Sequence, residues 1–374
     1  MEIFLFNVAS FIVIISIIVF VHEFGHYWVA KKSGVKIDSF SIGFGREIFG
    51  WNDKSGTRWK ISLVPMGGYV KMFGDEGAAS TPDEEKLSTL TPEEEKQTFH
   101  GKPLWVKSLI VFAGPGINFL FAIIIFAFMF AFMGKGYTTP ELGEIMKGGA
   151  AEEAGLQPGD VITELNGTSI DTFEEMRDII VLHPDIKLDM ILLRNGQETA
   201  GSITPRPREI TSAFDDKARV GYIGVTPAGN REYKELSVLS SINESIAETY
   251  SITERTLQAI KQIIFGQRSV RELSGIIRIG DYSGKAVRKS IDQGFYIIFW
   301  FMAVLSINLG LINLFPIPML DGGHLLFYGI EAIRRKPLPQ KAQEIFFRFG
   351  FAALITLMAM ALFNDLRHFG LFGG

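Results

Sequence analysis

The amino-acid sequence predicts a polytopic α-helical membrane protein with four spans, a membrane-associated β-element and an inserted α+β domain. Three observations lead to this fold class. The 374 residues are 47% hydrophobic, and the apolar residues gather in four long runs. Residues 34–74 are rich in glycine, β-branched and aromatic side chains, which is typical of short strands. Residues 134–294 are more polar and show strand and turn patterns, which indicates a soluble part between the second and third runs.

The four apolar runs are long enough to be membrane spans. A hydrocarbon core about 30 Å thick requires about 20 helical residues. The first run is not typical of a signal peptide, because Glu2 replaces a basic start, the run is too long and no small-residue cleavage site follows. The predicted spans are Ile3 to Val21, Ser108 to Met133, Phe295 to Leu320 and Ile345 to Phe363, the last being weaker because it contains Arg348.

Basic residues predict the orientation of the spans. Lys31, Lys32 and Lys36 follow the first span, and Lys102 and Lys107 precede the second. Further basic residues, at 334–341, separate the third and fourth spans. Because short cytoplasmic connections carry an excess of lysine and arginine, we expect both connections in the cytoplasm, with both termini and residues 134–294 outside.

Composition excludes several kinds of site. The chain has no cysteine, so disulfides and thiolate metal ligands are excluded. The formal net charge is −4 and no basic patch stands out, so nothing indicates a nucleic-acid partner.

The first half of the membrane core, residues 1–133, is expected to contain two soluble pieces. In the β-region 34–74, the stretch TRWKISLVPMGGYVKMFG (57–74) predicts two short strands around Pro65, Gly67 and Gly68. We expect a β-turn at Gly67, Gly68 and Tyr69 that dips toward a polar pocket in the bilayer. Residues 75–102 are mostly acidic and polar, which favours a solvated loop. The second half of the core comprises residues 295–374.

The exported part begins with a patterned module at 134–207. Residues 150–167, AAEEAGLQPGDVITELNG, predict a short helix, a turn, a strand and an Asn-Gly turn. An amphipathic helix capped by Thr172 follows at 172–183, and then a strand and a second Asn-Gly turn at 187–198. The module resembles a single PDZ domain of the bacterial, permuted kind over about Gly143 to Pro205.

PDZ domains bind a peptide as an added strand and hold its C-terminal carboxylate on backbone amides. The stretch ELGEI (141–145) is the predicted edge, with Leu142 and Gly143 near the carboxylate. A structural module without a ligand is the alternative. In 208–294, residues 219–229 predict a further strand and 240–266 a long amphipathic helix, which could lie on the membrane or clamp the module to the spans.

The sequence HEFGH, at the end of the first apolar run, has the spacing of a zinc site. His22 and His26 are four residues apart and project from one helix face, whereas Glu23 is free to act on a metal-bound water. Ionisable residues within a span are costly, which favours a functional role. A catalytic zinc requires a third ligand, and without cysteine it must be His, Asp or Glu.

The third ligand is predicted from topology. The first and third spans run in the same direction, so their ends meet on the cytoplasmic side. The third span ends in NLFPIPMLDGGH (313–324), where Asp321 and His324 are both candidate ligands. Pro316 and Pro318 break the helix there, and broken backbone at membrane depth is tolerated where it lines a cavity.

Together, HEFGH, AGPGIN (113–118), NLFPIPMLDGGH and one PDZ-like module resemble the site-2 protease family, specifically the regulator of sigma-E protease type. The resemblance implies a zinc endopeptidase in the bacterial inner membrane, with its PDZ domain in the periplasm. Its expected substrate is the transmembrane helix of a pre-trimmed single-span partner of the anti-sigma-factor type, cut during envelope stress. Better-known relatives carry two PDZ domains, whereas one is found here.

The resemblance also assigns residues. It implies Zn²⁺ held by His22, His26 and Asp321 rather than His324, with Glu23 as the base and Asn313 at the substrate backbone. Zinc lowers the pKa of its water to about 7 and polarises the scissile carbonyl, and Glu23 takes the proton. MGGYVKM (66–72) corresponds to a β-element that receives the unwound substrate. The expected substrate contacts are Gly67, Gly68, Tyr69, Val70, Pro316, Pro318, Leu142 and Gly143.

Two other functions remain as alternatives. The first is a non-catalytic PDZ adaptor, against which the presence of Glu23 argues, since a structural metal site needs no base. The second is a metal carrier, which would be expected to show repeated halves, and none is apparent.

Overall fold

The structure is a computed structural model, and it describes residues 2–77, 82–211, 217–229, 232–234, 236–336 and 338–370. The chain forms two compact units. Unit 1 comprises residues 1–126, 245–256 and 269–374, and unit 2 comprises residues 127–244 and 257–268.

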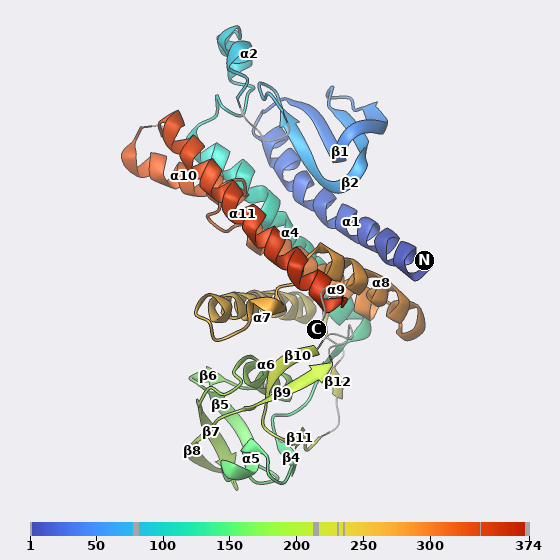
Figure 1. The fold of residues 1–374 in the computed structure, drawn as a ribbon, viewed down its shortest axis with the longest axis vertical. Helices are drawn as coiled ribbons and strands as arrows, with labels where there is room; N and C mark the ends of the chain where they lie inside the picture. Colours follow the sequence, from blue (N-terminus) through green and yellow to red (C-terminus); the bar gives the residue numbers. More distant parts are fainter. Residues whose placement is uncertain are drawn as a thin grey trace. The chain divides into compact units, whose positions relative to one another are not determined.

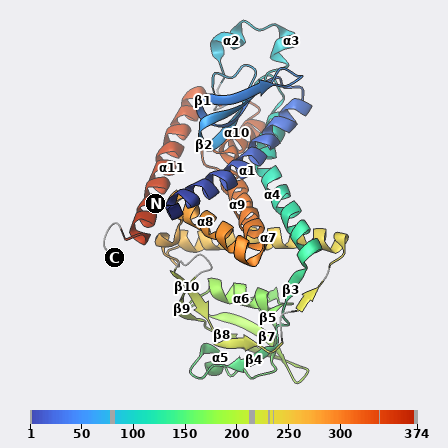
Figure 2. The same cartoon turned by 90° about the vertical axis from the view of Figure 1, so that its right-hand side faces the viewer.

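Among the described residues, four helices are long and apolar enough to cross a membrane: α1 (Glu2–Lys32), α4 (Leu104–Met133), α9 (Tyr296–Asn313) and α11 (Gln340–His368). They coincide with the four predicted spans (Figures 1 and 2). Helix α1 continues beyond the apolar run through HEFGH to Lys32. The third span is shorter than predicted, because α9 ends at Asn313 and residues 314–320, which contain both prolines, are not helical.

Glycines let the helices of unit 1 approach closely. A Cβ added at Gly25 of α1 would lie 2.3 Å from the carbonyl oxygen of Ala113 in α4. A Cβ added at Gly310 of α9 would lie 3.0 Å from the carbonyl oxygen of Pro115. Helices α1 and α9 therefore both pack on the AGPGIN segment of α4 with almost no space between the backbones.

The predicted β-region is an antiparallel sheet of β1 (Ile37–Asn52) and β2 (Arg58–Met72). Residues 39–42 pair with 58–61 on one side and with 68–71 on the other, so β2 folds back around β1. The expected β-turn at Gly67, Gly68 and Tyr69 is wrong, because all three residues lie within β2. Phe40 and Val70 of the sheet are buried in one apolar core with Tyr27 and Ala30 of α1.

The acidic segment is more structured than predicted. It contains α2 (Glu84–Ser88) and α3 (Pro92–Glu95), and Thr91 and Glu94 form a capping box at the start of α3. The backbone N–H of Lys36 donates to the carbonyl of Gln97 at 2.9 Å, which ties the segment to the start of the β-region. Residues 78–81 of the predicted loop lie outside the described residues.

Two further helices of unit 1 were not predicted. Helix α8 (Ile276–Gln293) follows the short η1 (Val270–Glu272) and packs along α1. The contact is close, because a Cβ added at Gly284 of α8 would lie 1.9 Å from Asn7 Oδ1 of α1. The buried carboxylate of Asp365 accepts hydrogen bonds from the N–H groups of Gly275, Ile277 and Arg278, so α11 caps the start of α8. Helix α10 (Asp321–Arg334) follows the proline loop.

Unit 2 contains the predicted α+β module. Helix α5 (Ala150–Glu153) is followed by a four-stranded sheet in the order β6-β5-β7-β8, formed by β5 (Val161–Leu165), β6 (Thr168–Ser169), β7 (Leu188–Arg194) and β8 (Gln197–Ile203). Helix α6 (Phe173–Leu182) has the predicted Thr172 cap, which forms a capping box with Glu175. Asn166 and Asn195 adopt positive φ angles of 50° and 52° in the two Asn-Gly turns, as the sequence predicts.

Short strands extend this module. They are β3 (Lys135–Tyr137), β4 (Leu142–Ile145), β9 (Arg206–Thr211), β10 (Lys217–Tyr222), β11 (Val225–Pro227) and β12 (Glu232–Lys234). Ile223, between β10 and β11, is buried in the same core as Leu142 and Ile162. The predicted long helix is α7 (Val238–Ile264), whose residues fall partly in each unit.

Candidate metal centre

Helix α1 brings two histidine rings to one point. His22 and His26 lie one helical turn apart, and their Nε2 atoms are 3.3 Å from each other. Asp321 is the first residue of α10, and its Oδ2 lies 3.3 Å from His22 Nε2 and 3.5 Å from His26 Nε2. Among the described residues, these three form the one group of His, Cys, Asp or Glu that could hold a metal ion.

The three atoms fit zinc. Tetrahedral coordination with zinc–ligand distances of about 2.0–2.2 Å sets the ligand atoms about 3.3–3.6 Å apart. The three measured separations are 3.3, 3.3 and 3.5 Å. Asp321 Oδ2 is also buried and has no hydrogen-bond partner among the described residues, as expected of an atom that faces a metal. A zinc ion bound here would act as a Lewis acid and activate water at neutral pH.

The glycines after Asp321 explain how the carboxylate reaches the histidines. A Cβ added at Gly322 would lie 2.3 Å from the carbonyl oxygens of both Leu314 and Phe315. A Cβ added at Gly323 would lie 2.5 Å from the carbonyl oxygen of Ile317. The DGG sequence therefore lets α10 begin directly against the loop that follows α9, which a larger residue would prevent.

The other predicted residues of this segment lie around the three-residue group. The ring of His324 packs against Tyr328 and Phe347, at centroid distances of 6.5 and 5.8 Å, and is not part of the group. Asn313 is the last residue of α9 and is half-buried. Pro316 is exposed, whereas Pro318 contacts α11, where a Cβ added at Gly350 would lie 2.5 Å from its Cβ.

Glu23 lies on α1, and its side chain faces the β-region. A Cβ added at Gly68 would lie 3.0 Å from Glu23 Cγ and 2.8 Å from the carbonyl oxygen of Ser41. Gly68 therefore allows the backbone of β2 to pass directly beside the predicted base. Tyr69, the next residue, stacks on Phe44 with ring centroids 5.9 Å apart, and Val70 is buried. Gly67 has a φ of 94°, which a glycine adopts without strain.

Helix α4 contributes contacts that sequence reasoning did not assign. The amide of Asn118 lies 3.2 Å from His22 Nδ1, and the carbonyl oxygen of Ile110 lies 2.9 Å from His26 Nδ1. A Cβ added at Gly114 would lie 2.2 Å from His26 Nε2. The AGPGIN motif contained part of the signal, because Gly114 and Asn118 lie four residues apart on one helix face, and Ile110 lies one turn before them on the same face.

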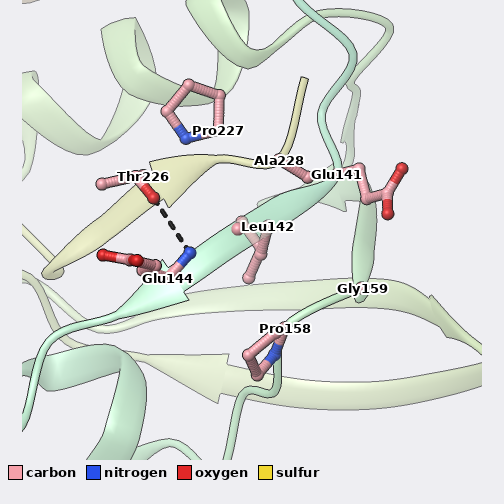
Figure 3. A pocket seen from close by; sticks show the side chains of 9 residues that line it. Glu141, Leu142, Glu144, Pro158, Gly159, Thr226, Pro227 and Ala228 are labelled. Carbon is pink, nitrogen blue, oxygen red and sulfur yellow. Dashed lines mark hydrogen bonds between the residues drawn. The ribbon is translucent and has the colours of Figure 1, made fainter. Parts of the chain in front are cut away.

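The predicted peptide edge in unit 2 requires a correction. On one side, Glu141, just before β4, forms a bridge with Val161 of β5, and Leu142 exchanges hydrogen bonds with Asp160 and Gly159; on the other side, β4 pairs with β11. The N–H of Glu144 donates to Thr226 Oγ1 at 2.9 Å across the β4–β11 pair (Figure 3). The edge of β4 is therefore not open, and Leu142 is fully buried.

The open edge belongs instead to β11. In the described part of the chain, β11 is the outer strand of the pair. Figure 3 shows β11 beside β4. A cavity of about 620 Å³ borders both strands, and Gly143, Pro158 and Pro227 help to line it. Sequence reasoning missed this strand order because nothing local indicates that residues 225–227 return to pair with 142–145.

Comparisons with known proteins agree with this geometry. The sequence model of peptidase family M50 matches residues 10–357. A relative from Agrobacterium fabrum, named as a zinc metalloprotease, is 40% identical over 96% of this chain and 95% of its own length. A relative of the same description from Rhizobium meliloti is 39% identical over 97% of this chain and 96% of its own. "Metalloprotease MmpA" of Caulobacter vibrioides is 34% identical over 99% of this chain and 97% of its own.

The family match covers most of the chain, and the relatives match it almost from end to end. The four apolar helices agree with a multi-pass membrane protein. The chain thus belongs to peptidase family M50, the site-2 protease family, and is a zinc metalloprotease.

Proposed function

We propose that this protein is an intramembrane endopeptidase that cuts the transmembrane helix of a single-span partner after another protease has trimmed the partner's exported domain. One observation carries the proposal: the three candidate ligands and Glu23 gather within α1, itself long and apolar enough to span a membrane, and at the start of α10, after the loop that follows α9. Polar and ionisable groups at this depth are costly unless they serve a function, so the bond that they attack is itself in the membrane.

In this proposal, His22, His26 and Asp321 bind zinc, and Glu23 acts as the general base. Glu23 follows His22 directly, so it lies close to the ligands without being one of the three. It takes a proton from the attacking water and passes it to the leaving amine.

The β-region would hold the substrate in an extended form. Residues 68–71 pair with β1 on one side, and their other edge has no strand partner among the described residues. This edge starts at Gly68, which lies beside Glu23. A transmembrane helix must unwind to expose its carbonyl groups, and an unwound segment could add to this edge as a strand, with its scissile bond near the base.

The partner's trimmed end could be held in unit 2. The open edge of β11 accepts an added strand, as a PDZ domain does. Just before β11, the backbone N–H groups of Ile223 and Gly224 have no hydrogen-bond acceptor among the described residues, which suits the carboxylate of a new C-terminus. The proposed location is the bacterial inner membrane. The basic residues in the short connections between the spans favour an orientation with unit 2 in the periplasm. An anti-sigma factor is the proposed partner class.

The decisive experiment is co-expression with candidate single-span membrane proteins, using the wild type and Glu23→Gln. The amide cannot accept a proton, so cleavage should fall roughly 10²- to 10⁴-fold. Zinc content and fold should not change, because Glu23 is not among the three candidate ligands. Near-normal cleavage by the variant would exclude Glu23 as the base. If the wild type cleaves no single-span protein, an adaptor or a metal carrier would be favoured instead.

A further inference from the structure

Helix α4 supplies no ligand, yet one stripe of it borders both histidines. Ile110, Gly114 and Asn118 lie on one face of the helix. The carbonyl oxygen of Ile110 is 2.9 Å from His26 Nδ1, and the amide of Asn118 is 3.2 Å from His22 Nδ1. Gly114, between them, leaves room for the rings. The stripe thus provides one polar partner for the Nδ1 atom of each histidine.

The chemistry of the metal site determines what these partners must do. A neutral imidazole that binds a metal through Nε2 carries its proton on Nδ1, and this N–H needs an acceptor. For His26 the acceptor is the Ile110 carbonyl. For His22 the atom placed opposite Nδ1 is Asn118 Nδ2, which is a donor, while Asn118 Oδ1 is buried and has no hydrogen-bond partner among the described residues.

The orientation of the amide resolves this conflict. The oxygen and nitrogen of an asparagine amide are assigned from their hydrogen bonds, and a half-turn about Cβ–Cγ exchanges them. In the exchanged orientation, Oδ1 faces the N–H of His22 and accepts its proton. The metal-binding state of His22 therefore selects this orientation.

We propose that Asn118 is a positioning residue of the metal centre: its Oδ1 accepts a hydrogen bond from His22 Nδ1–H and holds Nε2 toward the metal. This inference rests on the three-ligand site of the proposed function. Unlike the Ile110 carbonyl, the Asn118 amide can be removed by a side-chain substitution, so its role can be tested directly.

The surroundings of Asn118 hold the amide in place. Asn118 is fully buried, and its backbone carbonyl accepts a hydrogen bond from Ser306 Oγ of α9 at 2.9 Å. A Cβ added at Gly310 would lie 3.2 Å from Asn118 Cβ, so α9 closes over the residue. Because the pocket is closed, a variant that lacks the acceptor leaves the N–H of His22 without a partner.

The test measures the zinc dissociation constant of the full chain in detergent, by competition with a chelator. Asn118→Leu keeps a similar size but removes the acceptor, so we expect affinity to fall about 10- to 100-fold. Asn118→Asp restores an acceptor, so its affinity should match or exceed that of the wild type. Asn364→Leu is the matched control, because Asn364 is also a buried amide but donates to the Val270 carbonyl, away from the three-residue group.

Several results would overturn the proposal. Wild-type affinity in Asn118→Leu would show that His22 needs no such partner. An aspartate variant as weak as the leucine variant would show that the acceptor is not what matters. If the leucine variant lacks the helical circular dichroism of the wild type, Asn118→Ala replaces it in the same comparison. A wild-type chain that binds no zinc would contradict the metal site itself, whereas equal zinc affinity in all variants would contradict only the role of Asn118.

Discussion

At the scale of single residues, the metal site depends on which side chain of the DGGH segment faces the histidines. Asp321 and His324 are three residues apart, and both could bind zinc by their chemistry. The start of α10 directs Asp321 to within 3.3–3.5 Å of both histidines, while His324 packs against Tyr328 and Phe347. The choice between the two ligands can therefore be tested directly.

We expect Asp321→Ala to lose zinc and His324→Ala to keep it. Removal of one of three ligands should weaken zinc binding by at least about 100-fold, because the site is left with two. Metal analysis of the purified proteins measures this, with His22→Ala/His26→Ala as the control that removes the helix ligands. Retention of zinc in Asp321→Ala together with its loss in His324→Ala would reverse the assignment.

A second residue-scale feature determines how unit 2 responds to acid. The carboxylate of Asp160 is buried and accepts hydrogen bonds from Arg194 Nε at 2.8 Å and from Nη2 at 2.7 Å. These bonds, with a smaller contribution from the Gln157 N–H, lower the pKa of Asp160 below its ordinary value. In the unfolded chain the pKa is about 3.9. The stabilisation is therefore complete above that value and is lost as the pH falls through it toward the folded-state pKa.

We expect thermal unfolding of the wild type to shift to lower temperature as the pH falls below about 4. The Asp160→Asn side chain does not titrate, so this variant should be less stable at neutral pH and its unfolding temperature should depend less on pH. Unfolding of the full chain in detergent at a series of pH values measures both slopes. Parallel slopes would mean that other carboxylates govern the response.

At the scale of elements, helix packing depends on where glycine leaves space. Two helical glycines make a matched pair for this purpose. A Cβ added at Gly114 of α4 would lie 2.2 Å from His26 Nε2 and 2.9 Å from His22 Cε1, whereas one added at Gly329 of α10 would meet no atom of the described residues within 4 Å. Glycine-to-alanine substitution at both positions therefore separates the effect of crowding at the metal site from the effect of helix propensity.

We expect Gly114→Ala to weaken zinc binding by at least about 10-fold, because the methyl group displaces one or both rings. Gly329→Ala should bind zinc as the wild type does and should be more stable by roughly 0.5–1 kcal/mol, since alanine favours helix. Zinc titration and thermal unfolding of both variants test these outcomes. Unchanged zinc affinity in Gly114→Ala would mean that α1 and α4 can separate at no cost to the site.

At the scale of the whole molecule, the question is whether the module in unit 2 restricts access to the membrane site. The sequence resemblance covers 143–205, but Ile223 and β11 belong to the same folded module. A deletion of 143–205 would therefore leave β11 without its partner strand. The N–H of Ala228 donates to the carbonyl of Glu141 at 3.0 Å, so the two ends of 141–228 lie side by side and a short bridge can join them.

We predict that replacing 141–228 by a Gly/Ser bridge releases cleavage of an intact partner, which the full-length enzyme should cut only after trimming. A bulky exported domain would clash with the module, whereas a short stub would pass. The measurement compares one partner, intact and trimmed, with the full-length and deleted enzymes. Equal cleavage of both forms by the full-length enzyme would make the module an anchor or a spacer. The carbonyl of Gly224 and the N–H of Ala228 face β4, so the N–H of Val225 faces the open edge of β11. Val225→Pro removes this donor and separates capture from exclusion, because it should weaken only cleavage of the trimmed form.

Features that depend on a local pattern can be predicted from the amino-acid sequence. Apolar run length predicts the four spans, the spacing of His22 and His26 places both on one helix face, and Asn-Gly and Thr172 signals mark turns and a helix start in unit 2. Each of these features depends on residues within one continuous segment of the chain, so the sequence contains its cause. The chemistry of H-E-x-x-H is local in the same way.

The tertiary structure shows which distant groups meet; of these contacts, the family resemblance implied Asp321 as the third ligand, which the residues by themselves left open between Asp321 and His324. The placement of Asp321 rather than His324 beside the histidines, the contact of Asn118 with His22, and the passage of Gly68 beside Glu23 all join segments from different elements. The pairing of β11 with β4 is of the same kind, and it moved the open edge away from ELGEI. Such contacts are set by how closely backbones can pack at glycines and by strand register, and neither is fixed by the residues next to them in the chain.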